Sequence, residues 1–251
     1  MQITEIAVYD KKRKKIVLEE GAECFLLYLG ELRRLHLNVG EEMSETQYQE
    51  ILRDILIPRA RKKALYLLKN SDRTRAQLVR KLREGFYPQM VIDDVLSFLE
   101  QFHFVDDSRY AERYVEHLKE SRSRREIAAK LYQRGVCRET AAEQMESLTE
   151  EDEESACLKV LRQQYGRKLR QAKEALEALE AEGLEPAGRY SYAGRYGHGE
   201  EAGAEGLSEE DSAAACQAEA QALRRKAYAY LARRGFSYDA INHAFLQLEE
   251  E

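Results

Sequence analysis

Apolar residues recur along most of this chain at the spacing of one helix face. From residue 59 onward they fall three and four positions apart, which predicts a succession of amphipathic helices. The stripes come in two sets of three: Ala64, Leu65 and Leu68; Leu78 and Leu82; Val91, Ile92, Val95, Leu96, Leu99 and Phe102; then Tyr110, Ala111, Tyr114, Val115 and Leu118; Ile127, Ala128 and Leu131; Ala141, Ala142, Met145 and Leu148. We therefore predict a mainly α-helical protein whose helices are grouped in threes.

The first 58 residues follow a different pattern. The segments ITEIAVY, KIVLEE and AECFLLYL are short and rich in β-forming residues, which predicts a small β-containing region. The basic run from Lys11 to Lys15 is expected at the tip of its hairpin. Ser44 and Gln47 are spaced as a capping box, which predicts a helix that begins there and ends near Pro58.

The punctuation between the helices repeats at a fixed distance. The capping boxes Thr74–Gln77 and Ser123–Glu126 lie 49 positions apart, and each cap is followed eight residues later by a leucine. Gly85, Gly135 and Gly235 end the second helices, at spacings of 50 and 100 residues. Such self-similarity predicts three stacked copies of one unit, each about 50 residues long, with the glycine as a left-handed C-cap.

These signals divide the chain into four segments. They are an N-terminal extension at residues 1–58, helical repeats at 59–104 and 105–149, and a third repeat at 150–251. Residues 183–207 hold 7 of the 14 glycines, so we interpret about 183–211 as a flexible insertion in the third repeat, with its tyrosines and arginines tolerated in a linker. Stacking of the three repeats predicts an elongated, curved arrangement.

The charge of the chain is unevenly distributed. The whole sequence carries 40 Lys and Arg against 46 Asp and Glu, a net charge of −6. Residues 59–135 hold 18 basic against 11 acidic residues, whereas residues 136–251 hold 14 against 24. A basic middle beside an acidic end indicates a partner with separate electrostatic needs, although ordinary solvated helix surfaces also produce such counts.

Motifs for catalysis, metal binding or cofactor binding are missing from the sequence. There is no phosphate loop, no HExxH and no GxSxG, and the five histidines are isolated. Asp106 and Asp107 are interpreted as the start of a helix rather than as a cation site. Because these motifs are missing, we expect no enzymatic role. The N-terminus lacks an apolar signal region, no run is long enough to span a membrane, and the four cysteines are scattered, so we expect a cytoplasmic protein.

Basic residues flank the second helix of every repeat. If the repeats stack, these residues predict a continuous basic face suited to phosphates or to an acidic protein surface. A solvated helix face remains the alternative for any one helix. The members of this candidate basic face are Arg73, Arg75, Arg80, Lys81, Arg83, Arg122, Arg124, Arg125, Lys130, Arg134, Arg224, Arg225, Arg233 and Arg234.

Three stretches resemble the RecX family, the regulators of the bacterial recombinase RecA. They are ARKKALYLLKNSDRTRAQLVRKL at residues 60–82, FVDDSRYAERYV at 104–115 and YAYLARRGFSYDAI at 228–241, of which the last is the most specific. The resemblance covers about residues 59–170 and 220–248, and the plan of three three-helix repeats is similar to that fold. The stretch Glu120–Ser123, where the family often has a glycine, and the glycine-rich insertion depart from its pattern.

The resemblance implies a function. RecX proteins bind RecA filaments on single-stranded DNA, restrain strand exchange and ATP hydrolysis, and act in DNA repair, recombination and the SOS response. We therefore expect a monomeric, non-enzymatic regulator whose partner is the RecA filament, without cofactor or membrane. Because some members also contact DNA, a helical protein that binds single- or double-stranded DNA without RecA is the alternative, and a helical scaffold with an unrelated partner is a third.

Overall fold

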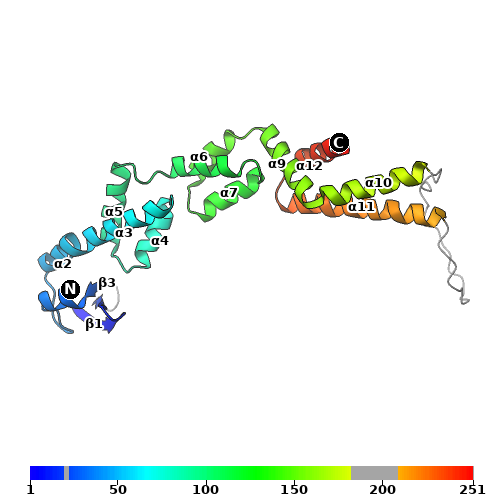
Figure 1. Ribbon diagram of the computed structural model, residues 1–251. Coiled ribbons are helices and arrows are strands. Elements are labelled where there is room, and N and C mark those ends of the chain that lie inside the picture. The colour runs from blue at the N-terminus through cyan, green and yellow to red at the C-terminus, as the bar shows by residue number, and fades with distance from the viewer. Residues whose placement is uncertain (20–22, 182–208, 251) are drawn as a thin grey trace, which may run out of the picture. The chain divides into compact units, whose positions relative to one another are not determined.

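The computed structural model describes residues 1–19, 23–181 and 209–250, and they are mainly helical (Figure 1). The chain divides into two compact units. The first comprises Met1–Val115 and Ala128–Met145, and the second comprises Glu116–Ile127 and Glu146–Glu251. Nearly all of the predicted glycine-rich insertion lies outside the described residues. The boundaries drawn between the repeats, and the arrangement of the repeats in an elongated stack, stay predictions.

The N-terminal region forms a three-stranded antiparallel sheet in the order β1 (Ile3–Val8), β2 (Arg13–Leu18) and β3 (Glu23–Tyr28), which confirms the predicted β-region. A short helix, α1 (Leu29–Arg34), follows. The basic run lies only partly at the hairpin tip, because β2 already begins at Arg13. The Asp10 carboxylate closes the turn by accepting the backbone N–H groups of Lys12 and Arg13 at 2.9 and 2.8 Å.

The helix that begins after Ser44 runs past Pro58, so the predicted end at this proline is wrong. The Ser44 hydroxyl caps α2 (Glu45–Ile51) by accepting the Gln47 N–H at 3.1 Å. A π-helical segment, η2 (Leu52–Leu56), then leads directly into α3 (Ile57–Asn70). The Ile57 N–H bonds to the Leu52 carbonyl five residues back. Pro58 lies in the first turn of α3, where a missing N–H is tolerated.

The first two repeats contain the predicted helices. They are α3, α4 (Arg75–Arg83) and α5 (Gln89–Gln101), followed by α6 (Asp107–Leu118), α7 (Arg124–Gln133) and α8 (Arg138–Glu146). The stripes of the first repeat supply one core that also includes the inner face of the sheet; it contains Ile16, Phe25, Leu78, Leu82, Val91, Ile92, Val95, Leu96 and Leu99, all buried. Three stripe members are wrong, since Leu65 and Phe102 are 36% and 56% exposed and Ala142 is exposed as well. Phe102 leaves the stripe because α5 ends at Gln101.

The third repeat is longer than the other two because its first two helices are extended. Its first helix combines α9 (Glu150–Leu161), the π-helical η3 (Arg162–Gly166) and α10 (Arg167–Ala181). Figure 1 shows α10 beside α11 (Glu209–Arg233), and α12 (Tyr238–Glu250) packs against α9. The extra length is therefore partly helical, and the sequence pattern identified only the segment between the two helices.

Cysteine is a core residue in this repeat. Cys157 is fully buried beside Leu161, Leu231 and Ile241, and burial raises the pKa of its thiol to about 12. All four cysteines of the chain are unpaired. A thiol with so high a pKa stays protonated at neutral pH, so it acts as a small apolar side chain. No helix among the described residues combines the length and the apolar composition that a bilayer crossing requires.

Two buried hydroxyls join consecutive second helices. At the first joint, the fully buried Thr74 at the N-cap of α4 donates its hydroxyl to the Arg134 carbonyl at 2.6 Å, just after α7. At the second joint, the fully buried Ser123 before α7 donates to the Arg234 carbonyl at 2.6 Å, just after α11. Each hydroxyl also accepts an N–H from its own helix, at 3.2 and 3.1 Å. Both predicted caps therefore also hold the next repeat.

A left-handed residue ends each second helix, as predicted, but in the first repeat it is not the glycine. Gly135 and Gly235 have φ angles of +85° and +84°, whereas Phe86 takes this role with a φ of +56°. In each case the next residue donates its N–H back to a buried leucine carbonyl, as in a Schellman motif; the pairs are Tyr87–Leu82, Val136–Leu131 and Phe236–Leu231. Phe86 and Gly135 both lie twelve residues after their caps, Thr74 and Ser123. The left-handed position is therefore the same in both repeats, and Gly85 lies one residue before it.

The first joint predicts that Gly135→Ala destabilises the fold for two reasons. A left-handed backbone costs a non-glycine residue about 1–2 kcal/mol, and a Cβ at residue 135 would lie 2.2 Å from the Ala76 Cβ. Gly40 also has a positive φ, +86°, but its Cβ would meet no atom within 4 Å. In urea unfolding, we expect Gly40→Ala to cost about 1 kcal/mol and Gly135→Ala about 3 kcal/mol.

Ala76→Gly supplies the control, because it removes the Cβ that residue 135 would meet. In the double variant of Gly135→Ala with Ala76→Gly, the free energy of unfolding should recover the part that was lost to the contact with the Ala76 Cβ. It should not recover the part that was lost to the positive φ. Equal losses for Gly40→Ala and Gly135→Ala would show that the first joint is not tightly packed.

Candidate functional site

The arginines that end the second helices stabilise the two joints. Arg134 donates to the Tyr110 hydroxyl at 2.5 Å, and its guanidinium lies over the Tyr114 ring at 4.6 Å. Arg234 donates from Nε to the Glu126 carboxylate at 3.0 Å and from Nη1 to the Tyr230 hydroxyl at 3.1 Å. Both side chains are partly buried. These two members of the candidate basic face thus have structural roles, and partner residues fix their positions.

Several other members are paired with carboxylates. Arg75 binds Glu100 at 2.9 Å, and its backbone N–H donates to Asp107 at 2.8 Å. The remaining pairs are Lys81–Glu84, Arg80–Glu84, Arg122–Glu126 and Arg224–Glu249. The pairs around Glu84 are exposed and each contributes little to stability. A ligand would have to compete with these carboxylates for the paired cations.

The Asp106–Asp107 pair lies at helix starts, as predicted. Asp106 accepts the backbone N–H groups of Ser108 and Arg109 at 2.9 and 3.0 Å, which caps α6. Asp107 reaches the start of α4, and burial raises the pKa of its carboxyl group. Within the described part of the chain, no cluster of three or more His, Cys, Asp or Glu side chains could hold a metal ion.

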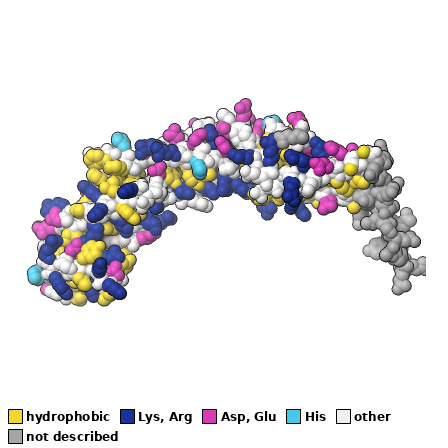
Figure 2. Space-filling model, viewed as in Figure 1, with side chains coloured by type: hydrophobic (Ala, Val, Ile, Leu, Met, Phe, Trp, Pro, Cys, Tyr) yellow, Lys and Arg dark blue, Asp and Glu magenta, His cyan; other side chains and the backbone are white. Residues whose placement is uncertain are grey.

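Four members are exposed and have no carboxylate within 4.0 Å among the described residues. They are Arg83 at the end of α4, Arg125 in the first turn of α7, and Arg225 and Arg233 on α11. Arg83 donates to the Gln89 side chain at 2.9 Å, and within the described part of the chain the two α11 arginines bond to carbonyls of their own helix. Figure 2 shows Lys and Arg side chains gathered over α7. These four arginines are the best placed to bind an anionic partner.

The other members are less accessible. Arg73 and Arg124 each bury an Nε atom that has no hydrogen-bond partner within the described residues. Arg124 lies near Glu153. Burial raises the pKa of the Glu153 carboxyl group, and the charge of Arg124 lowers it. Lys130 is partly buried on α7. The predicted face therefore separates into structural, paired, partly buried and accessible groups.

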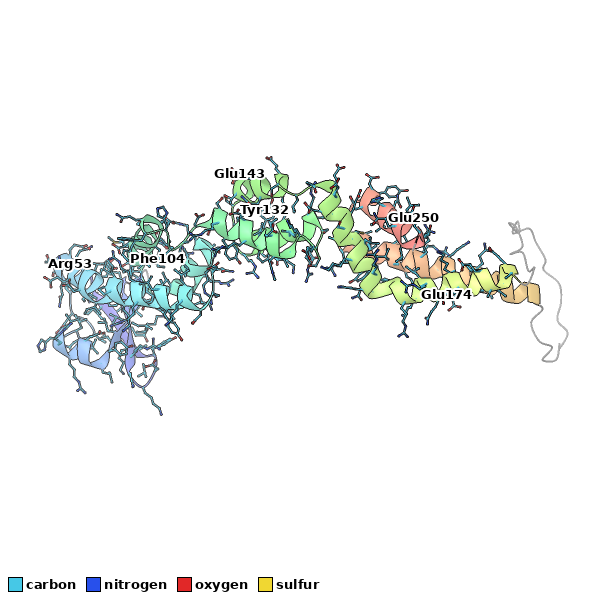
Figure 3. All side chains as sticks on the ribbon, turned by 45° about the horizontal axis from the view of Figure 1, so that its top comes forward. Arg53, Phe104, Tyr132, Glu143, Glu174 and Glu250 are labelled. Carbon is cyan, nitrogen blue, oxygen red and sulfur yellow. The ribbon has the colours of Figure 1, made fainter. Side chains whose placement is uncertain are left out.

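An exposed aromatic patch was missed because Phe102 was assigned to the core. Phe98, Phe102 and Phe104 lie with ring centroids 4.9–6.4 Å apart where α5 ends, and Phe104 follows in the loop before α6 (Figure 3). Phe102 and Phe104 are 56% and 50% exposed. Figure 2 shows hydrophobic side chains gathered there. Exposed patches of this kind often contact other proteins, and the spacing of FLEQFHF was its only sequence signal.

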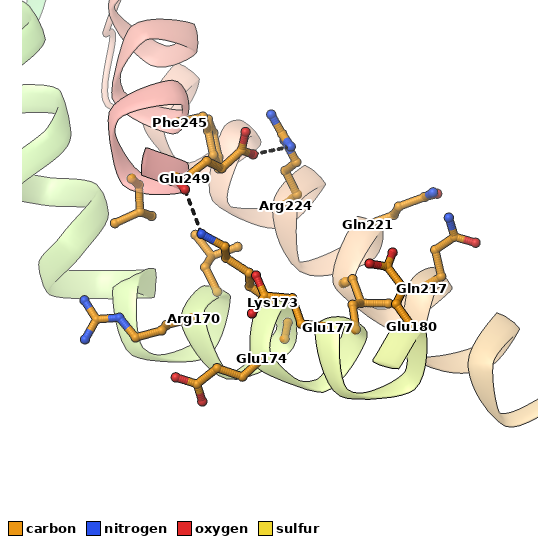
Figure 4. Close-up of a pocket in the computed structure, with 15 residues that line it drawn as sticks. Arg170, Lys173, Glu174, Glu177, Glu180, Gln217, Gln221, Arg224, Phe245 and Glu249 are labelled. Carbon is orange, nitrogen blue, oxygen red and sulfur yellow. Dashed lines mark hydrogen bonds and ion pairs between the residues drawn. The ribbon is translucent and has the colours of Figure 1, made fainter. Parts of the chain in front are cut away.

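A groove of about 660 Å³ lies between α10, α11 and the end of α12 (Figure 4). Its floor is apolar and includes Leu176 and Phe245. Its rim carries both charges: Lys173 donates to the Glu249 carbonyl at 2.7 Å, and Arg224 pairs with the Glu249 carboxylate at 2.5 Å. Glu174, Glu177 and Glu180 of α10 also line the groove, so its rim is of mixed charge with more carboxylates than cations. Among the described lining residues, none forms a pair of nucleophile and base.

The neighbouring Arg233 and Arg234 allow a test of this sorting. Arg234→Ala would remove the partly buried hydrogen bonds that this arginine donates to Glu126 and Tyr230, while Glu126 keeps Arg122 as a partner, and we expect a cost of about 2 kcal/mol. Arg233→Ala removes an exposed side chain and should change the unfolding free energy by about 0.5 kcal/mol or less. Urea titrations of both variants check this, and a loss at Arg233 as large as at Arg234 would contradict the assignment.

Three family models match this chain, one for each repeat. The first three-helix domain of RecX matches residues 60–99, the second matches 106–145, and the third matches 215–245. The matched ranges contain both joint hydroxyls, Thr74 and Ser123, and the arginines whose carbonyls accept them, Arg134 and Arg234. Residues 1–59, α9 and α10 lie outside these ranges. The repeat plan read from the sequence is therefore found independently in the family models.

Relatives and solved structures agree. "Regulatory protein RecX" of Clostridium tetani is 26% identical over 165 residues, covering 65% of this chain and 76% of that protein. The protein of the same name from Thermobifida fusca is 38% identical over 109 residues, covering 43% and 59%.

Two crystal structures share the fold. One of regulatory protein RecX has a TM-score of 0.54 at 19% identity and covers both chains fully. One of RecX from Lactobacillus salivarius has a TM-score of 0.53 at 18% identity, covering 78% of this chain and 97% of the other. With three matched RecX domains, relatives named RecX and the same fold, this chain belongs to the RecX family.

Proposed function

We propose that this chain regulates the recombinase RecA by binding RecA filaments on single-stranded DNA. Its main effect is to inhibit strand exchange and ATP hydrolysis, in DNA repair, recombination and the SOS response in the cytoplasm. The match of all three repeats to RecX domains carries the proposal. Relatives named regulatory proteins support a binding role rather than catalysis. The chain acts as a monomer without a cofactor.

The joints support a binding surface because they hold the second helices at their ends. The start of α7 is held through Ser123, and the end of α11 is held through Arg234. A helix held in this way presents exposed side chains such as Arg125 and Arg233 in defined positions. Less conformational entropy is then lost when a partner binds them. An arginine without a carboxylate partner can bind a carboxylate or a phosphate with two parallel hydrogen bonds.

The test reverses the accessible arginines of the second unit and leaves the structural ones intact. The triple variant Arg125→Glu, Arg225→Glu, Arg233→Glu avoids Arg124, whose Nε is buried. Each exposed charge pair is worth roughly 0.5 kcal/mol, so three reversals should raise the concentration for half-inhibition about tenfold. The measurement is the ATPase activity of RecA on single-stranded DNA, with RecA from the same organism.

A matched control makes the same change of charge on another helix of the same unit. The triple variant Arg167→Glu, Lys168→Glu, Arg170→Glu changes three exposed cations at the start of α10. It should inhibit RecA like the unaltered protein. If both triple variants lose inhibition equally, net charge rather than these arginines is responsible, and if neither loses it, the accessible arginines are not the binding surface. No effect of the unaltered protein on RecA would contradict the proposed function itself.

Direct DNA binding without RecA is the second candidate function, because the same accessible arginines suit phosphates. It predicts that the unaltered protein binds an oligothymidylate in the absence of RecA, and that the affinity falls steeply as salt rises. The arginine reversals should then reduce both the affinity and its dependence on salt. A weak affinity that salt does not change would exclude this function and leave the filament as the ligand.

A further inference from the structure

A second basic site lies away from the candidate basic face, between the N-terminal sheet and the first repeat. A pocket of about 360 Å³ is formed there by side chains from β2, β3, α3 and the turn after α4. This volume is at the lower end of the range for small-molecule sites, about 300–1,000 Å³. Its lining residues are Arg13, Leu26, Tyr28, Arg59, Lys62, Lys63, Tyr66, Gly85, Phe86 and Tyr87.

The lining contains four cations and no carboxylate. Arg13 is neutralised by Asp10 at 2.6 Å, and Arg59 is neutralised by Glu31. Lys62 and Lys63, by contrast, have no carboxylate within 4.0 Å among the described residues. The pocket therefore keeps two ammonium groups without an ion-pair partner among the described residues, with Glu84 the acidic charge that acts on Lys63, and unpaired cations favour the binding of an anion.

Lys63 is the more unusual of these two lysines. Its side chain is partly buried, and burial lowers the pKa of its ammonium group, as do the nearby charges of Arg13 and Lys81. A Cβ on Gly85 would lie 2.5 Å from the Lys63 Nζ, so the glycine makes room for the amine. Gly85 comes directly before the left-handed Phe86, just as Arg134 and Arg234 come directly before the left-handed glycines of the later repeats. The first repeat thus has an open lysine where the others have a structural arginine.

Aromatic rings line the same pocket. Tyr66 and Tyr28 are 65% and 42% exposed, and the Arg59 guanidinium lies 4.7 Å from the Tyr28 ring centroid. At the back, Tyr87 faces the Lys63 ammonium at 5.5 Å. Exposed rings beside unpaired cations are the combination that binds nucleotides, since a base stacks on a ring and a phosphate binds the cation.

We propose that this pocket binds one nucleotide, with its phosphate at Lys62 and Lys63 and its base against Tyr66. The nucleotide is either free or part of a single strand, because both offer the same phosphate and base. The site uses Arg13, Leu26 and Tyr28, which lie outside the ranges matched by the RecX models. It is independent of the proposed RecA regulation and can be tested without RecA.

The first test is acetylation of lysines, read residue by residue by mass spectrometry, with thymidine monophosphate or an oligothymidylate added. Lys62 and Lys63 should be protected, whereas the exposed Lys69 on the same helix should not. Protection by the monophosphate identifies a free nucleotide as a ligand, and protection by the oligothymidylate alone identifies a strand. If neither probe protects the two lysines, the proposal is wrong.

The second test measures binding of the protecting probe to variants of the full chain. Lys62→Gln with Lys63→Gln should weaken binding at least tenfold, because two charge-assisted contacts are lost. Lys69→Gln with Lys168→Gln is the control with the same change of charge, and both of its lysines are exposed. An equal loss in both variants would overturn the proposal, and circular dichroism should show the same helix content in both.

The position of the base is tested through Tyr66. Tyr66→Ala should weaken binding about tenfold through the loss of stacking, whereas Tyr132→Ala, an exposed tyrosine on α7, should leave it unchanged. Inorganic phosphate should protect the two lysines less well than the nucleotide does. If phosphate protects equally and Tyr66→Ala has no effect, the pocket does not bind a nucleotide.

Discussion

The fold depends on one constraint, which is that a buried hydroxyl must keep its hydrogen bonds. Thr74 and Ser123 are fully buried, and each hydroxyl accepts from its own helix and donates to a carbonyl of the next repeat. An unpaired buried hydroxyl costs roughly 1–3 kcal/mol, so the cap and the joint are retained together. A capping residue usually stabilises only its own helix. Here its hydroxyl also requires a backbone carbonyl of the following repeat, so it determines which part of that repeat packs against the cap.

Two further features follow from the same joints. The carbonyl that receives the hydroxyl belongs to an arginine, and the next residue is left-handed with little room around it. A Cβ on Gly135 would meet Ala76, and a Cβ on Gly235 would lie 3.1 Å from the Ser123 Oγ and from the Arg125 Cβ. The arginine side chain then binds tyrosine hydroxyls, and in the second joint Glu126 as well. In the first repeat, Gly85 stands at the position of this arginine, and it lines the pocket around Lys63.

This division changes the interpretation of a basic helix face. Counts of Lys and Arg treated all fourteen members of the candidate basic face alike, yet Arg134 and Arg234 are structural and Arg75 is paired with Glu100. Reversing a structural arginine would disturb the fold and imitate a loss of binding. The accessible group, with Arg125 and Arg233 as examples, is therefore the one in which a change of charge reports on a partner.

The sequence by itself determined the features that depend on near neighbours. The caps at Thr74 and Ser123, the leucines eight residues later and the glycines that end α7 and α11 all follow from hydrogen bonds within one helical turn or its end. Only the tertiary structure decided what lies across a joint, because Thr74 and Arg134 are 60 residues apart and Ser123 and Arg234 are 111 apart. The same holds for the pocket, where Arg13 and Lys63 come from separate elements. Whether a charge is paired, buried or free depends on residues that no local pattern brings together.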